Sequence, residues 1–267
     1  MRRWPSILLA LTLLGTSVAQ NNGKIDSAQY YERGMNALLG TGVSHNDQTA
    51  LQALRTSAEL GYLPAQTAVG YFYDTGNLVA PEPGQAAEWY RKAAKQGDSL
   101  GAWLAGRLYY TGSGVARDSN EAASYFQSAA DQGDPFGQYF LGLVRLDRQD
   151  YAKAAASFRK SAEQGLPQAQ YQLAQLLKDG KGVDRDRFEA YIWLLVSLSA
   201  GNQTASSDLS FLEGDLGSAQ LQKAKARARE LENTATRSVA PHGCTGWPGE
   251  FAAVPSPPPP DLQRFCR

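Results

Sequence analysis

A unit that recurs at steps of 36, 36, 32 and 36 residues constrains the fold of this chain more than any other feature. The steps separate the glycines that close successive units, which are Gly61, Gly97, Gly133, Gly165 and Gly201. The clearest unit runs from Asp98 to Gly133 and reads DSLGAWLAGRLYYTGSGVARDSNEAASYFQSAADQG. Repetition at a fixed period of this length is typical of architectures in which identical small units stack on one another.

Each unit predicts two helices. In the unit 98–133, apolar residues fall at helical spacing in two sets, 104–109 and 122–130. Turn glycines lie between the sets, Asp118 and Ser119 are the two candidate caps of the second helix, and Gly133 ends it. The unit is therefore predicted to be a helical hairpin. One hairpin cannot bury its apolar face alone, so successive hairpins are expected to stack into a solenoid with a continuous core.

Two positions of the unit are predicted to form the contact between helices. The first helix carries a small residue that keeps the period, at Gly34, Gly70, Gly106, Gly142 and Ala174. A bulky residue stands seven positions before each closing glycine, at Leu54, Tyr90, Phe126, Phe158 and Leu194. We expect the small residues to let neighbouring helices approach and the bulky ones to fill the layer between them.

The segments AGRLYYTGSGVARD, EWYRKAAKQG, YFQSAADQG and KDGKGVDRD resemble the Sel1-like repeat, a relative of the tetratricopeptide repeat. The resemblance implies an all-α fold, a right-handed α-solenoid, and a non-catalytic role in assembling complexes. We place the repeats at 27–61, 62–97, 98–133, 134–165 and 166–201. The first repeat departs from the family pattern at Arg33 and Ala37. The fourth lacks the Gly-rich connection and has Arg145 where Tyr73 and Tyr109 supply a packing ring, so it is predicted to be the least stable repeat.

Residues 202–233 are predicted to form a helical cap. A terminal unit of a solenoid needs a polar outer face, which Lys223, Lys225, Arg227 and Arg229 supply. The alternative is a basic surface for acidic lipid. A membrane-surface helix also needs a strong apolar face, whereas alanines dominate here.

A Pro-rich tail at 234–267 contains the two cysteines of the chain, Cys244 and Cys266. In an exported protein such a pair predicts one disulfide, with 21 residues between the two cysteines. The alternative is a metal site with His242, which would have three ligands and no zinc-finger spacing. We therefore expect the disulfide and no metal.

The first 19 residues predict a secretory signal peptide. Two arginines precede an apolar run at 7–14, and small residues at 17–19 favour cleavage after Ala19. An uncleaved membrane anchor is the alternative, but the run is far shorter than the ~20 residues that span a bilayer. We expect export, to the periplasm or beyond, without stable membrane insertion.

The charge balance and the scarcity of catalytic motifs exclude several functions. The chain has 26 basic and 26 acidic residues, which removes the electrostatic basis for nucleic-acid binding. It has two histidines and no Gly-x-Ser-x-Gly element, and its glycine-rich turns lack the Lys-Ser/Thr ending of a phosphate loop. No catalytic activity and no cofactor are predicted.

The remaining candidate for a functional site is a surface on one face of the first helix of each repeat. Positions i, i+4 and i+7 that the family does not use for packing carry large polar or aromatic side chains, among them Tyr71, Trp103, Arg107, Tyr110, Tyr139 and Tyr171. The resemblance implies that this face lines a concave groove. We expect it to bind a protein or peptide, with Trp103, Arg107 and Tyr110 at the centre and dispensable for folding. Two alternatives stay open: an envelope glycan, peptidoglycan or exopolysaccharide, stacked on the rings, and aromatic side chains that belong to the inter-repeat core.

Overall fold

The computed structural model describes residues 26–238, which form twelve α-helices and no strand. The five hairpins are α1 (Ser27–Leu39) with α2 (Asp47–Glu59), α3 (Leu63–Thr75) with α4 (Pro83–Lys95), α5 (Ser99–Thr111) with α6 (Ser119–Asp131), α7 (Pro135–Asp147) with α8 (Tyr151–Glu163), and α9 (Pro167–Asp179) with α10 (Arg187–Ser199). Two further helices follow, α11 (Ala205–Glu213) and α12 (Ser218–Ser238). The predicted signal peptide and the predicted disulfide between Cys244 and Cys266 lie outside the described residues.

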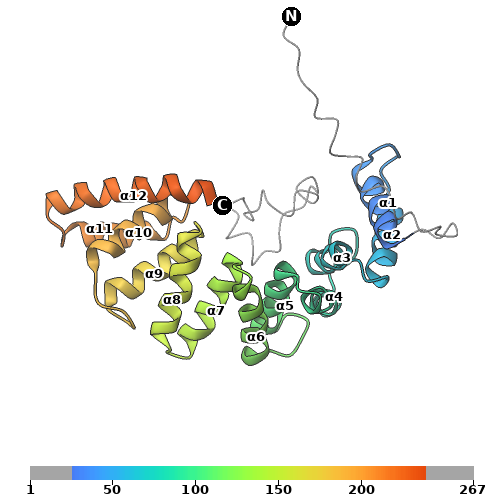
Figure 1. The fold of residues 1–267 in the computed structure, drawn as a ribbon, viewed down its shortest axis with the longest axis horizontal. Helices are drawn as coiled ribbons and strands as arrows, with labels where there is room; N and C mark the ends of the chain where they lie inside the picture. The colour runs from blue at the N-terminus through green and yellow to red at the C-terminus, as the bar shows by residue number, and fades with distance from the viewer. Residues whose placement is uncertain (1–25, 239–267) are drawn as a thin grey trace, which may run out of the picture.

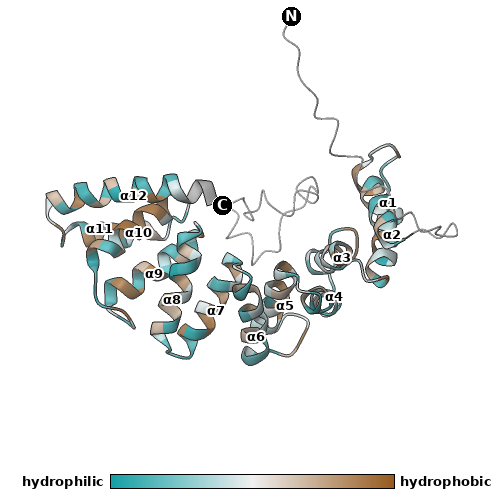
Figure 2. Ribbon diagram, in the orientation of Figure 1, coloured by the Kyte–Doolittle hydropathy of each residue, from teal (hydrophilic) through white to brown (hydrophobic). Residues whose placement is uncertain are grey.

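The helices stack in chain order along an arc (Figure 1). Each helix packs against the next one in sequence from α1 to α11, and α5 also contacts α7. In the middle of the arc, α3 and α5 lie toward its inside and α4 and α6 toward its outside (Figure 1). Brown, hydrophobic and teal, hydrophilic stretches alternate along the helices (Figure 2), as expected for helices that bury one face. The predicted all-α solenoid is confirmed.

Local signals in the sequence explain where the helices begin and end. Of the two candidate caps for α6, the residue that caps it is Asp118, whose carboxylate accepts hydrogen bonds from the backbone amides of Asn120 (2.8 Å) and Glu121 (3.0 Å). The backbone leaves α6 through Gly133, whose φ of +83° is the left-handed conformation that glycine adopts without strain.

The small and bulky positions of the repeat meet as predicted. A Cβ built on Gly106 would lie 2.7 Å from the Phe126 ring, and one on Gly70 would lie 2.7 Å from the Tyr90 ring. The bulky residues are fully buried in all five repeats. The first and second helix of a repeat therefore approach so closely that an alanine in place of either glycine would overlap the partner ring.

The fourth repeat compensates for its departures from the pattern. The Arg145 guanidinium donates hydrogen bonds to Ser157 on α8 (2.6 Å) and to Gln127 on α6 (3.1 Å), which joins the repeat to its neighbour. The connection from α7 to α8 is three residues long, and Gln149 takes the left-handed conformation there, with φ of +61°. The missing tyrosine ring is thus replaced by a polar bridge, and the low stability of this repeat stays a prediction.

The cap extends further than its sequence indicates. Helix α12 continues to Ser238, beyond the end expected at residue 233. Its alanines Ala224 and Ala228 are buried, and α12 packs on α10. Lys223, Lys225, Arg227 and Arg229 of α12 are exposed, as a cap requires.

Candidate functional site

Trp103, the expected centre of the groove, is a packing residue. Its side chain is 5% exposed, and its ring stacks on Phe136 (4.9 Å between centroids) and on Phe140 (5.9 Å) of α7. The expectation that this ring lies free in the groove is wrong. The physical reason is that the first helix of the next repeat covers the same face of α5, so an aromatic residue there fills the joint between two repeats.

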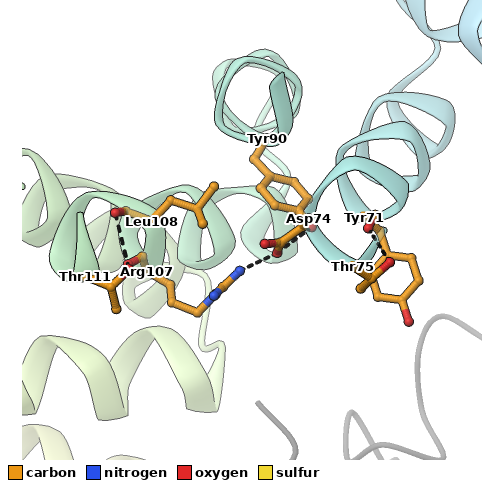
Figure 3. Close-up of polar contacts among 7 residues, drawn as sticks. All are labelled: Tyr71, Asp74, Thr75, Tyr90, Arg107, Leu108 and Thr111. Carbon is orange, nitrogen blue, oxygen red and sulfur yellow. Dashed lines mark hydrogen bonds and ion pairs between the residues drawn. The ribbon is translucent and has the colours of Figure 1, made fainter. Parts of the chain in front are cut away.

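Arg107 lies in a buried polar cluster rather than on the surface. It is 3% exposed and forms an ion pair with Asp74 of the preceding repeat (Figure 3). The Tyr90 hydroxyl donates a hydrogen bond to the same carboxylate at 3.2 Å. Burial, together with the negative charge of Asp74, raises the pKa of Tyr90 well above its ordinary value, so its hydroxyl keeps its proton. Arg107 therefore ties repeats two and three together, and its expected role as an accessible contact is wrong.

Tyr71 and Tyr139 are also buried, with 2% and 6% of their surface exposed. Tyr71 lies 6.0 Å from Phe72, and Tyr139 lies 5.3 Å from Phe140 and 5.9 Å from Phe158. Both rings therefore belong to the core of the solenoid and are not accessible side chains of the groove.

Tyr110 and Tyr171 remain half-buried, and each is anchored to a carboxylate of the next unit. The Tyr110 hydroxyl donates to Asp147 at 2.6 Å, and the Tyr171 hydroxyl donates to Asp208 at 3.1 Å. Burial raises the pKa of Tyr110 to about 12, and the hydrogen bond and the charge of Asp147 act in the same direction. In both pairs the acceptor lies 37 residues after the donor, about one repeat further along the chain.

Asp208 joins the cap to the fifth repeat. Besides Tyr171, it accepts a hydrogen bond from Gln175 (2.9 Å) and forms an ion pair with Lys178. Burial alone would raise the pKa of Asp208, but the three donors outweigh it and hold the pKa below its ordinary value. These contacts are not evident from the i, i+4 and i+7 spacing of the inner face. An acidic residue one period after a tyrosine is the signal that could have found both Asp147 and Asp208.

In the middle of the array, side chains of α5 and α7 on the inner face stay partly open. Tyr110 is half-buried, Leu143 and Leu146 of α7 are packed only partly against the core, and Asp147 is exposed. We call these four residues the α5–α7 strip. It combines an aromatic ring, two aliphatic side chains and a carboxylate, which suits an apolar contact with one polar anchor.

The described residues meet neither the requirements of a metal site nor those of a membrane-spanning helix. Between residues 26 and 238, no group of three or more histidine, aspartate or glutamate side chains is arranged to hold a metal ion. In the same range, no helix is both long and apolar enough to cross a membrane.

Stacked helical hairpins with a continuous core and a polar cap define an α-solenoid scaffold of the tetratricopeptide kind. The Sel1 repeat model matches five consecutive stretches, at residues 30–62, 63–98, 99–134, 135–166 and 167–202. The chain therefore belongs to the Sel1 repeat family, whose members are generally non-catalytic scaffolds and protein-interaction modules.

Two solved structures are similar in fold and sequence. A Sel1 repeat protein from Oxalobacter formigenes superposes with a TM-score of 0.65 at 28% identity, over 79% of this chain and 85% of that one. The protein c5321, described as a protective antigen of uropathogenic Escherichia coli with an SLR fold, gives a TM-score of 0.53 at 28% identity. That match covers 80% of this chain and 55% of c5321.

Proposed function

We propose that this chain is an exported, non-catalytic scaffold that binds a protein or peptide partner on the inner face of the solenoid, centred on the α5–α7 strip. The observation that carries the proposal is the incomplete burial of Tyr110, Leu143 and Leu146 in the middle of the array, where the neighbouring Trp103, Arg107 and Tyr139 are buried. These three side chains are the apolar surface through which the solenoid would contact a partner.

The strip is rigid before a partner arrives. The Tyr110 ring packs edge-on against Phe126 at 6.2 Å, its hydroxyl is bonded to Asp147, and the Arg117 guanidinium lies 5.8 Å from the ring. A side chain already held in one position loses little entropy on binding, which favours affinity. The exposed Asp147 carboxylate adds an acceptor for a lysine, an arginine or a backbone amide of the partner.

Burial of most aromatic side chains of the inner face makes an envelope glycan the weaker alternative. Sugar recognition by stacking needs accessible ring faces, whereas Trp103, Tyr71 and Tyr139 are all buried. Tyr110 and Tyr171 stay half-exposed and lie two repeats apart. A protein partner needs no continuous series of exposed rings.

Export is part of the proposal and has its own test. The mature chain is expected to begin at Gln20 and to hold Cys244 and Cys266 as a disulfide. N-terminal sequencing of the exported protein tests the first point. Intact mass after alkylation without reduction tests the second, because two alkyl adducts would show that both thiols are free.

Capture of partners from an envelope extract tests the binding function. The wild-type mature chain is compared with Tyr110→Ser/Leu146→Asp, which disrupts the strip, and with Lys160→Glu, which changes an exposed residue of α8. Loss of about 2 kcal/mol of binding, on the order of thirtyfold in affinity, is expected for the strip variant alone. Captured proteins that disappear after muramidase digestion of the extract would instead support a glycan ligand. Equal capture by the strip variant would move the site elsewhere.

A further inference from the structure

A second surface feature lies on the edge of the solenoid at the fourth repeat. A pocket of about 600 Å³ opens between α6, α7 and α8, with Leu141, Val144 and Ala123 beneath it and Arg145, Arg148 and Lys153 around it. None of these residues belongs to the α5–α7 strip.

The pocket exists because the fourth repeat lacks a loop that its neighbours possess. In the third repeat, the glycine-rich loop lies directly on the start of α4, and a Cβ on Gly114 would come within 2.3 Å of the Gly84 backbone nitrogen. In the fifth, Gly182 is pressed in the same way against Ala152 at the start of α8. The three-residue turn between α7 and α8 is visibly shorter than the loops after α5 and α9 (Figure 1). At the start of α6 this turn therefore leaves room that a loop fills elsewhere.

One arginine partly takes the place of the missing loop. Arg148 donates from Nη2 to the backbone carbonyl of Ser119 (3.1 Å) and to the Asn120 side chain (2.8 Å). Both contacts are made with one end of the guanidinium, which has five N–H donors. The side chain is exposed and lines the pocket.

The pocket carries excess positive charge. Its one carboxylate, Asp150, is bonded to Lys153 at 2.7 Å, and this hydrogen bond holds the pKa of Asp150 below its ordinary value despite slight desolvation. The hydrogen-bond partners of Arg145 and Arg148 are neutral groups, and within residues 26–238 neither guanidinium forms an ion pair. Three cations against one anion leave a formal excess of two positive charges.

The apolar floor of the pocket restricts the kind of ligand that can bind there. Leu141 and Val144 are buried apolar side chains, and Ala123 is half-buried beside them. The Arg148 guanidinium favours a carboxylate because it can donate two parallel hydrogen bonds, and Lys153 supplies a second cation beside it. An apolar floor with these two cations at its rim matches a segment in which acidic residues flank an aliphatic side chain, and it offers little to a free inorganic anion.

We infer that this pocket, defined by Arg145, Arg148 and Lys153 over Leu141 and Val144, binds a short acidic segment of the protein partner. The inference rests on the proposed function, because it supplies a second contact for the same class of ligand. Arg148 and Lys153 engage the carboxylates at the rim. Arg145 adds its charge from beneath while remaining bonded to Ser157 and Gln127.

Selection from a random dodecapeptide phage library tests the inference. The wild-type chain is compared with Arg148→Glu/Lys153→Glu and with a control, Lys95→Glu/Lys160→Glu, which changes the net charge equally at exposed positions of α4 and α8. Peptides selected by the wild type and by the control are expected to be rich in Asp and Glu around an aliphatic residue. Their affinity should fall about tenfold or more in the pocket variant, and equally when their acids are replaced by amides.

The outcomes separate this inference from the proposed function. Selected peptides that lose binding to Tyr110→Ser/Leu146→Asp but not to the pocket variant would refute the pocket and leave the scaffold function standing. Peptides that lose binding only to the pocket variant would support the pocket as a binding site and refute binding at the α5–α7 strip. Displacement by inorganic phosphate at constant ionic strength would refute the peptide assignment. Failure to select any peptide would refute both.

Discussion

The contact between Gly106 and Phe126 gives the sharpest stability prediction, for the change Gly106→Ala. The added methyl would lie 2.7 Å and 2.8 Å from two carbons of the Phe126 ring and 3.2 Å from the Ala122 carbonyl oxygen. Favourable carbon–carbon contacts need about 3.5 to 4.0 Å. Phe126 is fully buried and stacks on Phe140 at 5.1 Å, so its ring cannot move aside without disturbing the next repeat.

Two opposing effects set the change in the free energy of unfolding for Gly106→Ala. Overpacking a rigid core costs about 1 to 3 kcal/mol, whereas replacing glycine by alanine in a helix gains about 1 kcal/mol. The difference between the two effects is a net loss of about 0 to 2 kcal/mol, and the rigid setting of Phe126 favours the upper end. For a domain of this size, a loss at the upper end corresponds to a fall of about 4 to 8 °C in the melting midpoint. Thermal melts followed by circular dichroism measure it.

The fifth repeat supplies the compensating change. It pairs Ala174 with Leu194, so Gly106→Ala/Phe126→Leu copies a combination that the chain already uses. A double-mutant cycle is expected to give a favourable coupling of about 0.5 to 3 kcal/mol. Gly214→Ala is the control, because its new methyl would meet only the Phe211 carbonyl oxygen at 3.6 Å. A rise in midpoint for Gly106→Ala, or simple additivity in the cycle, would refute the steric argument.

Three further changes test the joints between repeats. Trp103→Ala is expected to lower the free energy of unfolding, measured by urea titration, by about 3 to 5 kcal/mol, because the ring is buried between α5 and α7. An unchanged urea midpoint would show that Trp103 is an accessible residue of the groove. Arg107→Ala removes the guanidinium that pairs with the buried Asp74 carboxylate, and it should lower the free energy of unfolding by about 3 to 5 kcal/mol. The loss should be markedly larger than that of the double variant Arg107→Met/Asp74→Asn, in which no charge is left behind. The lowered pKa of Asp208 means that its stabilisation is complete above the ordinary carboxyl pKa and is lost as pH falls through the lower, folded-state value. Asp208→Asn should therefore flatten acid unfolding of the cap, and an unchanged pH profile would contradict this.

The helix pairs and their internal contacts could be predicted because the physics that sets them is local. Capping by Asp118, termination at Gly133 and the match of Gly106 to Phe126 all act within one repeat, and each leaves a pattern at a fixed spacing. The end of α12 at Ser238 was missed because the change in composition near residue 233 precedes the end of the helix.

The candidate site was predicted less well, and Arg107 shows why. A spacing of i, i+4 and i+7 identifies one face of a helix but carries no information on what covers that face. A charged residue in the stripe suggested exposure, yet Arg107 is buried because Asp74, 33 residues earlier, provides its counter-charge. Tyr110, on the same face, stays half-buried, and its hydroxyl donates a hydrogen bond to the exposed Asp147 of the next repeat.

The sequence by itself determined the repeat, the helical hairpin and the pairing of small with bulky residues, since these depend on neighbours within about one period. Tertiary structure alone decided which side chains of the inner face are buried between repeats and which remain open. It also decided that the shortened turn before α8 leaves a cationic pocket over Leu141 and Val144. Both outcomes depend on how one hairpin is placed against the next, and that placement arises from packing across the whole joint rather than from the spacing of residues in either hairpin.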